Sequence, residues 1–216
     1  MPKHLYISKP SGEIGGYINR IEALGYRVQA ESMITFEALD FDLTEDHDIT
    51  FFGSPRAVLF FRFKYDLKRA GLIACSGSKT QELLESFGYP PEFVADQSKG
   101  VNAASNEFAA WVENRKVFFP TSSKSLMSFA LNLDKDHWQR ADCYSTNITP
   151  KKVEDADIYV FTSPSNVAGF LEANKVTKDA QIISWGSSTS KALSDKEIQF
   201  TELPEPSMDA LLDLLK

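Results

Sequence analysis

Cysteine and histidine are scarce in this chain of 216 residues. Cys75 and Cys143 each stand beside apolar residues typical of strands, so we expect reduced thiols in the core rather than a disulfide. His4, His47 and His137 are far apart and show no ligand spacing with cysteine or with one another. The composition therefore predicts no metal site.

The chain also lacks a long apolar run and a basic cluster. No run approaches the roughly 20 apolar residues of a membrane span, and residues 1–10 lack the apolar stretch of a signal peptide. A net charge of −7 without a Lys/Arg-rich segment disfavours binding to nucleic acid, although a single basic pocket is compatible with it. We expect a cytoplasmic protein that binds neither membrane nor nucleic acid.

Motifs for nucleotide cofactors are absent as well. Neither Gly-x-Gly-x-x-Gly nor Gly-x-x-x-x-Gly-Lys-Ser/Thr occurs, so nucleotide cofactors are not indicated. Acidic residues fall mostly in expected linkers and on the outer faces of expected helices, which disfavours a pair of catalytic carboxylates. Hydrophobic residues at 43% and charged residues at 25% are typical of a globular protein with a core of its own.

What the chain does contain is a repeated pattern. Phe-Gly-Ser-Pro-Arg-Ala-Val at 52–58 returns as Phe-Thr-Ser-Pro-Ser-Asn-Val at 161–167, and Gly-Ser-Lys-Thr at 77–80 returns as Gly-Ser-Ser-Thr at 186–189. Both pairs are separated by the same 109 residues. Two motifs at one offset indicate an internal duplication, and each copy is long enough for an α/β lobe of about a hundred residues.

Expected strands alternate with expected helices, which is typical of parallel sheets flanked by helices. Extended stretches at 30–36 and 141–148 are expected to pair as a two-stranded antiparallel linker. We therefore predict a discontinuous first lobe over residues 1–35 and 143–216, an inserted second lobe over 36–142, and a cleft between them. Apolar spacing also predicts helices over 14–24 and 126–133.

Six turns from strand to helix are rich in Ser, Thr and Gly. The turns lie at 8–9, 53–54, 77–80, 121–123, 162–166 and 186–189. In parallel sheets, ligands bind where strands end and helix N-termini present unpaired N–H groups, so the six together favour an anionic ligand with several carboxylates or phosphates. The alternative for any single turn is ordinary helix capping by Ser or Thr.

Tyr144 lies in the expected linker. There its phenol can face the cleft and donate a hydrogen bond, or its ring can simply pack as a linker aromatic. Position alone does not separate these readings.

Several of these motifs resemble those of a known family. Residues 161–167, Gly-Ser-Ser-Thr-Ser-Lys-Ala-Leu at 186–193 and Pro-Glu-Pro-Ser-Met-Asp-Ala-Leu-Leu at 204–212 resemble the C-terminal pattern of uroporphyrinogen-III synthases. Cys-Tyr-Ser-Thr at 143–146 resembles the tyrosine-bearing linker strand of that family. The order and approximate spacing of the motifs cover nearly the whole chain.

The resemblance implies two α/β lobes with the substrate between them and no metal or organic cofactor. The family closes the linear tetrapyrrole hydroxymethylbilane to uroporphyrinogen III in haem biosynthesis, with inversion of ring D and loss of water. By similarity, Tyr144 would be the catalytic proton donor. The implied substrate-binding residues are Lys9, Ser54, Thr80, Ser163, Ser165, Asn166, Ser187, Ser188 and Thr189.

Two residues depart from the family pattern. Lys9 stands where arginine is frequent, and Ser188 where the first of two threonines is found. Both keep the polar function, but lysine offers a point charge rather than a bidentate fork.

Two other functions are compatible with the residues. One is a noncatalytic two-lobed binding protein for a small polycarboxylate, and the other is a duplicated scaffold whose Ser and Thr turns only cap helices. We expect the protein to be a monomer.

Overall fold

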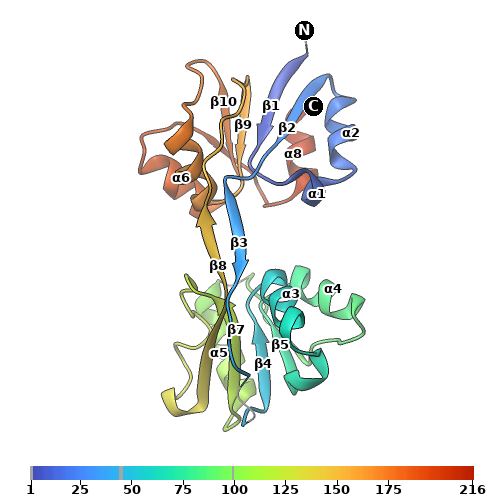
Figure 1. The fold of residues 1–216 in the computed structure, drawn as a ribbon, viewed down its shortest axis with the longest axis vertical. Coiled ribbons are helices and arrows are strands. Elements are labelled where there is room, and N and C mark those ends of the chain that lie inside the picture. Colours follow the sequence, from blue (N-terminus) through green and yellow to red (C-terminus); the bar gives the residue numbers. More distant parts are fainter. Residues whose placement is uncertain (1, 44–45, 99) are drawn as a thin grey trace. The chain divides into compact units, whose positions relative to one another are not determined.

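The computed structural model describes residues 2–43, 46–98 and 100–216, which form two compact units (Figure 1). Unit 1 comprises Met1–Thr35 and Asn147–Lys216, and unit 2 comprises Phe36–Thr146. The chain passes between the units on strands β3 and β8, which are neighbours in the sheet of unit 2.

Unit 1 is built on a sheet of five strands in the order β11-β10-β9-β1-β2, and its neighbouring strands pair in parallel. The strands are β1 Lys3–Ile7, β2 Tyr26–Ala30, β9 Ile158–Phe161, β10 Gln181–Ser184 and β11 Thr201–Glu202. The helices are α1 Ser11–Ile14, α2 Tyr17–Glu22, α6 Pro164–Ala173, α7 Ser187–Ser194 and α8 Met208–Leu215.

Unit 2 is built on a sheet of six strands in the order β3-β8-β7-β4-β5-β6, in which β8 to β6 pair in parallel. The strands are β3 Ile34–Ala38, β4 Ile49–Phe52, β5 Leu72–Cys75, β6 Phe93–Val94, β7 Val117–Ser122 and β8 Trp138–Ile148. The helices are α3 Pro55–Lys64, α4 Ser78–Ser86 and α5 Val101–Val112, with short 3₁₀ turns at Leu67–Ala70 and Lys135–His137.

Both faces of each sheet are buried. Successive residues of a strand point to opposite faces, so Phe51 packs with α5 while Phe52 packs with α3 and α4. In β9, Val160 packs with α1, α2 and α8, and Phe161 packs with α6 and α7. Parallel sheets need such cover on both faces, which explains why β4 and β9 are buried throughout. Across the described residues, no helix has the length and apolarity needed to cross a membrane.

The duplication extends beyond the sequence motifs. The strand order β6-β5-β4-β7-β8 in unit 2 matches β11-β10-β9-β1-β2 in unit 1, whose last two strands come from the N-terminal part of the chain. Ser54 and Ser163 have φ/ψ of −166/158° and −163/157°. Gly77 and Gly186 have 159/179° and 167/177°. The two units therefore repeat one backbone path at these turns.

Two helices predicted from apolar spacing differ in the structure. The helix expected over 14–24 is interrupted at Gly15, whose φ of 40° is not helical, and is replaced by α1 and α2. The helix expected over 126–133 is wrong, because this segment forms turns. There the Ser125 hydroxyl accepts from the Met127 N–H and Met127 takes a φ of 53°, so local side-chain bonding replaces the helical pattern.

One difference between the copies predicts a stabilising substitution. After α4, Gly88 takes a φ of 82°, and the equivalent residue after α7 is Glu197, with a φ of 57°. A left-handed backbone strains a residue with a Cβ but not glycine. Glu197→Gly should therefore raise the free energy of unfolding by about 0.5–1 kcal/mol, measured by urea denaturation.

The matched substitution is Gly88→Ala, which should lower the free energy of unfolding by about 1 kcal/mol. If Glu197→Gly also lowered the free energy of unfolding, backbone strain at residue 197 would be ruled out as a significant contribution to stability.

Candidate functional site

The two Ser-Pro turns are closed by their own side chains. The Ser54 Oγ accepts a hydrogen bond from the Ala57 N–H at 3.2 Å, and the Ser163 Oγ accepts from the Asn166 N–H at 3.3 Å. In each turn, proline occupies the first helical position, where its missing N–H costs nothing. Helix capping therefore accounts for both serines without a ligand.

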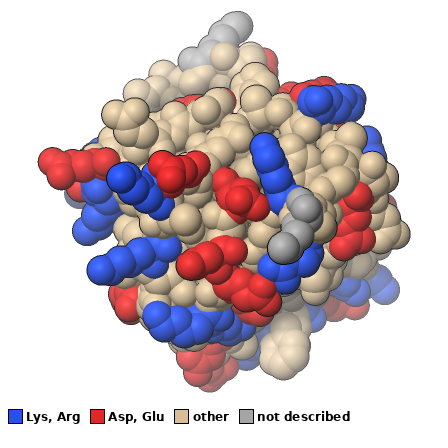
Figure 2. All heavy atoms as spheres, turned by 90° about the horizontal axis from the view of Figure 1, so that it is seen from above, with Lys and Arg blue, Asp and Glu red and all other residues tan. Residues whose placement is uncertain are grey.

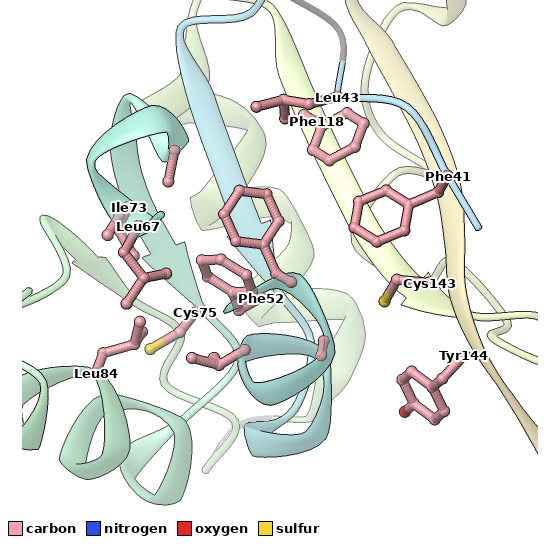
Figure 3. Close-up of a cluster of buried hydrophobic side chains, with 14 residues drawn as sticks. Phe41, Leu43, Phe52, Leu67, Ile73, Cys75, Leu84, Phe118, Cys143 and Tyr144 are labelled. Atoms are coloured by element: carbon pink, nitrogen blue, oxygen red, sulfur yellow. The ribbon is translucent and has the colours of Figure 1, made fainter. Parts of the chain in front are cut away.

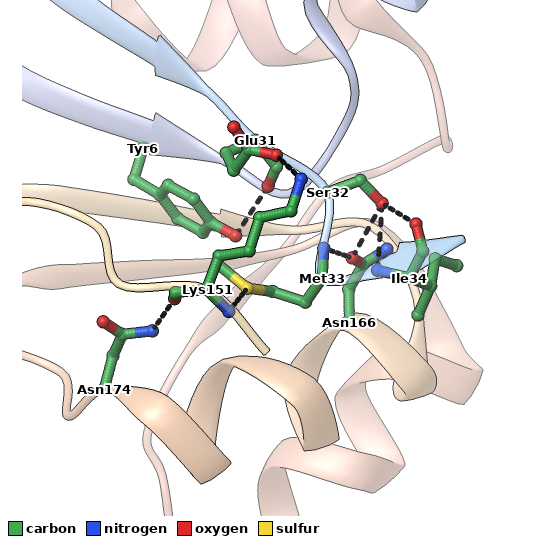
Figure 4. Close-up of polar contacts among 8 residues, drawn as sticks. All are labelled: Tyr6, Glu31, Ser32, Met33, Ile34, Lys151, Asn166 and Asn174. Carbon is green, nitrogen blue, oxygen red and sulfur yellow. Dashed lines mark hydrogen bonds and ion pairs between the residues drawn. The ribbon is translucent and has the colours of Figure 1, made fainter. Parts of the chain in front are cut away.

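Asn166 is occupied by structural contacts as well. Its Oδ1 accepts from the Met33 N–H at 2.8 Å and lies 3.3 Å from the Ser32 hydroxyl (Figure 4). Its Nδ2 donates to the Ser163 Oγ at 3.0 Å. The residue is only 3% exposed. These contacts hold α6 against the segment that leads into β3. Ser165, its half-buried neighbour, has no side-chain hydrogen bond among the described residues.

The two Gly-Ser turns are open by comparison. Helices α4 and α7 begin after Gly77 and Gly186, which have no side chain to cap them. The Thr80 and Thr189 N–H groups bond to the carbonyl groups of these glycines at 3.1 and 2.9 Å, leaving the N–H groups that precede them at the open end of the helix. Such helix ends carry partial positive charge and attract anions.

Burial follows the same pattern at both Gly-Ser turns. Ser187 and Ser188 are exposed and Thr189 is buried, just as Ser78 is exposed and Thr80 is buried. Of the residues predicted at these turns, the two serines can therefore meet a ligand directly. Each threonine is 2% exposed and lies under the turn.

A hollow adjoins each open turn. Beside α7 it has a volume of about 350 Å³ and is lined by Thr162, Trp185, residues 186–189 and residues 202–206. Beside α4 it has a volume of about 410 Å³ and is lined by residues 76–78 and 94–97. The two hollows occupy equivalent places in the duplicated units.

Lys9 lies close to the hollow of unit 1. Its Nζ is 5.5 Å from the ring centroid of Trp185, which lines that hollow, and 3.7 Å from the Glu13 carboxylate. Sequence reasoning missed Trp185 and Glu202 in the same hollow. An alignment of the two duplicated halves of the sequence is the signal that could have directed attention to Trp185 and Glu202.

The Tyr144 ring is packed within unit 2. It stacks on Phe60 with centroids 4.9 Å apart and planes at 14°, and it meets Phe36 edge-on at 6.0 Å. The Arg56 guanidinium covers Phe36 at 3.5 Å from its centroid. The residue is 7% exposed and lies at the edge of the apolar cluster (Figure 3).

The Tyr144 hydroxyl has no hydrogen-bond partner among the described residues, and it is not among their buried unpaired atoms. The packing of the ring agrees with the reading of Tyr144 as a linker aromatic.

The cysteine thiols cannot serve as nucleophiles. Both are free and buried, as predicted. Burial raises the pKa of the Cys143 thiol to about 12, and it raises the pKa of the Cys75 thiol as well. Since the thiolate is the reactive form, both thiols are inert near neutral pH.

Two of the three histidines lie closer together than their sequence positions indicate. His47 and His137 line one hollow of about 60 Å³ with Trp138. Within the described part of the chain, no three His, Cys, Asp or Glu side chains are grouped in a way that could hold a metal ion.

Charges of both signs are mixed over the face drawn in Figure 2. Lys and Arg side chains alternate there with Asp and Glu rather than gathering in one basic area.

Comparison with known proteins gives a consistent result. A family model described as uroporphyrinogen-III synthase HemD matches residues 16–213. The chain is similar to the crystal structure of uroporphyrinogen-III synthetase from Helicobacter pylori 26695, with a TM-score of 0.73 and 18% identity over 99% of this chain and 98% of that one. A search of curated proteins finds no similar sequence.

A second similar structure is a mutant uroporphyrinogen III synthase from the extremely thermophilic bacterium Thermus thermophilus, with a TM-score of 0.62 and 13% identity. The similarity covers 98% of this chain and 97% of that one. At these identities the two structures bear on the fold alone, which they share with this chain.

The contacts of Asn166 predict a structural role that can be measured. Asn166→Ala leaves the buried Met33 N–H without its acceptor, so it should lower the free energy of unfolding by about 2–3 kcal/mol in chemical denaturation. Ser165→Ala is the matched control and should change it by less than about 0.5 kcal/mol. Equal effects of the two substitutions would contradict this role.

Proposed function

The chain belongs to the uroporphyrinogen-III synthase family, and from that premise we propose how its residues act. The enzyme closes hydroxymethylbilane to uroporphyrinogen III in haem biosynthesis, with inversion of ring D and loss of water. The family match over residues 16–213 carries this conclusion. No comparison supports the alternative of a noncatalytic binding protein.

The open Gly-Ser turns are the proposed sites for the carboxylates of the substrate. Ser187 and Ser188 would donate from their N–H and hydroxyl groups, with Thr189 beneath them and Lys9 supplying a positive charge. Thr80 would support the equivalent turn of unit 2. Exposed N–H groups at a helix N-terminus favour such a ligand even in a protein whose net charge is −7.

Ser54, Ser163, Ser165 and Asn166 are weaker candidates for direct contact with the substrate. Three of them have side-chain bonds that already serve the fold, and Ser165 is half-buried beside them. We propose that their main contribution is to hold α3 and α6 in place.

Tyr144 is the proposed proton donor. The pyrrole nitrogen drives loss of the hydroxyl, so a phenol is a sufficient acid. Its packed ring would keep the hydroxyl in a defined place, which is the requirement for general acid catalysis. The enzyme must also hold the substrate in a suitable conformation. The terminal ring of the substrate has to attack through its substituted carbon, which gives a spiro intermediate.

The most direct experiment supplies hydroxymethylbilane and separates the product isomers. The enzyme should give uroporphyrinogen III, whereas ring closure in solution gives the uninverted isomer. Only the uninverted isomer, or binding without turnover, would overturn the function. Cytoplasmic location and a monomeric state stay predictions from the sequence, to be checked by fractionation and sedimentation.

Removal of the Tyr144 hydroxyl should slow the reaction. Tyr144→Phe keeps the ring stacking and removes the proton, so kcat should fall about 100-fold in a stopped assay of product isomers. Tyr65→Phe is the control, because the Tyr65 hydroxyl bonds to the Phe41 carbonyl in the same cluster and has no proposed part in turnover. Unchanged kcat and isomer ratio in Tyr144→Phe would end the donor role.

Substitution in an open turn should affect binding rather than folding. Ser188→Ala removes one hydroxyl that is proposed to meet a substrate carboxylate, so KM should rise about 3- to 10-fold. Ser207→Ala removes the N-cap of α8, whose Oγ accepts from Ala210, and should cost about 1 kcal/mol of stability without changing KM. The turn would lose its binding role if Ser188→Ala lowered stability and left KM unchanged.

A further inference from the structure

Unit 2 contains a hollow with an aromatic interior, built from residues of that unit alone. Its volume is about 240 Å³. Phe51, Phe119 and Phe129 are buried on its inner side, and the Phe51 ring centroid lies 4.6 Å from that of Phe129 and 5.4 Å from that of Phe119. The polar residues that line it are Ser76, Gln97, Thr121, Ser125 and Ser128. An apolar interior with a few polar groups is typical of sites for small ligands.

The duplication identifies what stands at the same place in unit 1. Ser76 lines the hollow, and the residue 109 positions later is Trp185. Each directly follows a strand end, and their N–H groups bond to the Phe52 and Phe161 carbonyls at 3.2 and 2.9 Å. Ser76 and Trp185 therefore occupy equivalent backbone positions, although their side chains differ greatly in size.

The indole of Trp185 takes the place that unit 2 leaves open. It packs against the apolar cluster that contains Ile7 and Val160. The strand registers make Phe119 and Phe51 the equivalents of these two residues, and both line the hollow. Unit 1 thus places a ring of its own against its inner cluster, whereas unit 2 has a hollow there.

Two further differences act in the same direction. Gly53 stands where unit 1 has Thr162, and Thr121 stands where unit 1 has Lys9, whose Nζ lies 5.5 Å from the Trp185 ring centroid. Both Gly53 and Thr121 line the hollow. Small residues at three equivalent positions therefore open this space, which the shared backbone alone does not determine.

We propose that this hollow binds one pyrrole ring of the tetrapyrrole substrate. The inference rests on the proposed function and names the part of the substrate that unit 2 holds. A pyrrole is a planar N–H heteroaromatic ring, like the indole that unit 1 carries at the equivalent place, and phenylalanine rings pack favourably against such a ring. Drug-sized ligands need roughly 300 Å³ or more, so the hollow suits one ring rather than the whole tetrapyrrole.

The hollow adjoins the open turn that is proposed to receive a carboxylate. Ser76 and Gln97 line both this hollow and the one beside α4. A ring in the first hollow can therefore extend a carboxylate arm towards the second. Asp96 lines only the second hollow, where its Oδ1 accepts from the Ser98 N–H at 2.9 Å. Among the described residues, no charged side chain lines the first hollow, so it selects a ring and not a charge.

Indole-3-acetate is the probe for this hollow, because it joins a planar N–H ring to a short carboxylate arm. Acetate is the matched ligand without a ring. Titration with indole-3-acetate up to about 10 mM should shift the backbone N–H resonances of Val101 and Ser128, which line the hollow, whereas acetate should not. Equal shifts with the two ligands, or none with indole-3-acetate, would overturn the proposal.

Ser76→Trp gives unit 2 the residue that unit 1 carries and should close the hollow. It should abolish the shifts caused by indole-3-acetate and raise the KM for hydroxymethylbilane about 10-fold. Ser86→Trp is the control, because Ser86 is an exposed serine outside the hollow whose hydroxyl also donates to a backbone carbonyl, and it should change neither quantity by more than about two-fold. Unchanged shifts in Ser76→Trp would contradict the proposal, as would an unchanged KM.

Gly53→Thr is a second variant that tests the hollow if Ser76→Trp lowers stability. A Cβ at Gly53 would meet no atom within 4 Å, and unit 1 has threonine at this position. The variant should keep the urea midpoint of the unaltered protein and weaken binding of indole-3-acetate about 3-fold or more. Unweakened binding would contradict a ring site at this place.

Turnover of the unaltered protein to uroporphyrinogen III is measured first. Absence of that product would refute the function, and with it the pyrrole ring as the ligand of the hollow. Its presence, with an unchanged KM in both Ser76→Trp and Gly53→Thr, would refute only the ring pocket. The two failures are therefore distinguishable.

Discussion

The constraint on which the structure depends is that every helix leaves its first N–H groups without partners. This protein meets that constraint in two ways. At α3 and α6, a serine side chain closes the turn, and a proline removes one N–H group. At α4 and α7, glycine stands at the turn and the helix end stays open. Because the duplication repeats both solutions, closed and open turns occur in each unit.

This contrast connects the fold with the chemistry. Closed turns order the helices over the sheets, and Asn166 extends that function to the segment leading into β3. Open turns supply positive potential for a polycarboxylate substrate without an excess of basic residues. The same backbone carries different side chains at equivalent places, as Glu202 in unit 1 and Val94 in unit 2 illustrate.

Much of the fold could be predicted from the sequence, because apolar strands, Ser-Pro turns and the 109-residue offset are local signals. The break at Gly15 and the turns at 126–133 were not predictable from apolar spacing, since backbone conformation and a serine side chain decide them. At the site, sequence reasoning treated all Ser-rich turns alike. Only the hydrogen bonds distinguish a serine that caps its own helix from one that is left for a ligand.

The central claim is that the open turns, and not the Ser-Pro turns, receive the carboxylates. The backbone N–H resonances of the protein during titration with uroporphyrinogen III test it most directly. The account predicts large shifts for Ser78, Ser187 and Ser188, and small shifts for Ala57 and Asn166, whose N–H groups are already bonded to serine. Large shifts at Ala57 and Asn166 with none at Ser187 and Ser188 would contradict it.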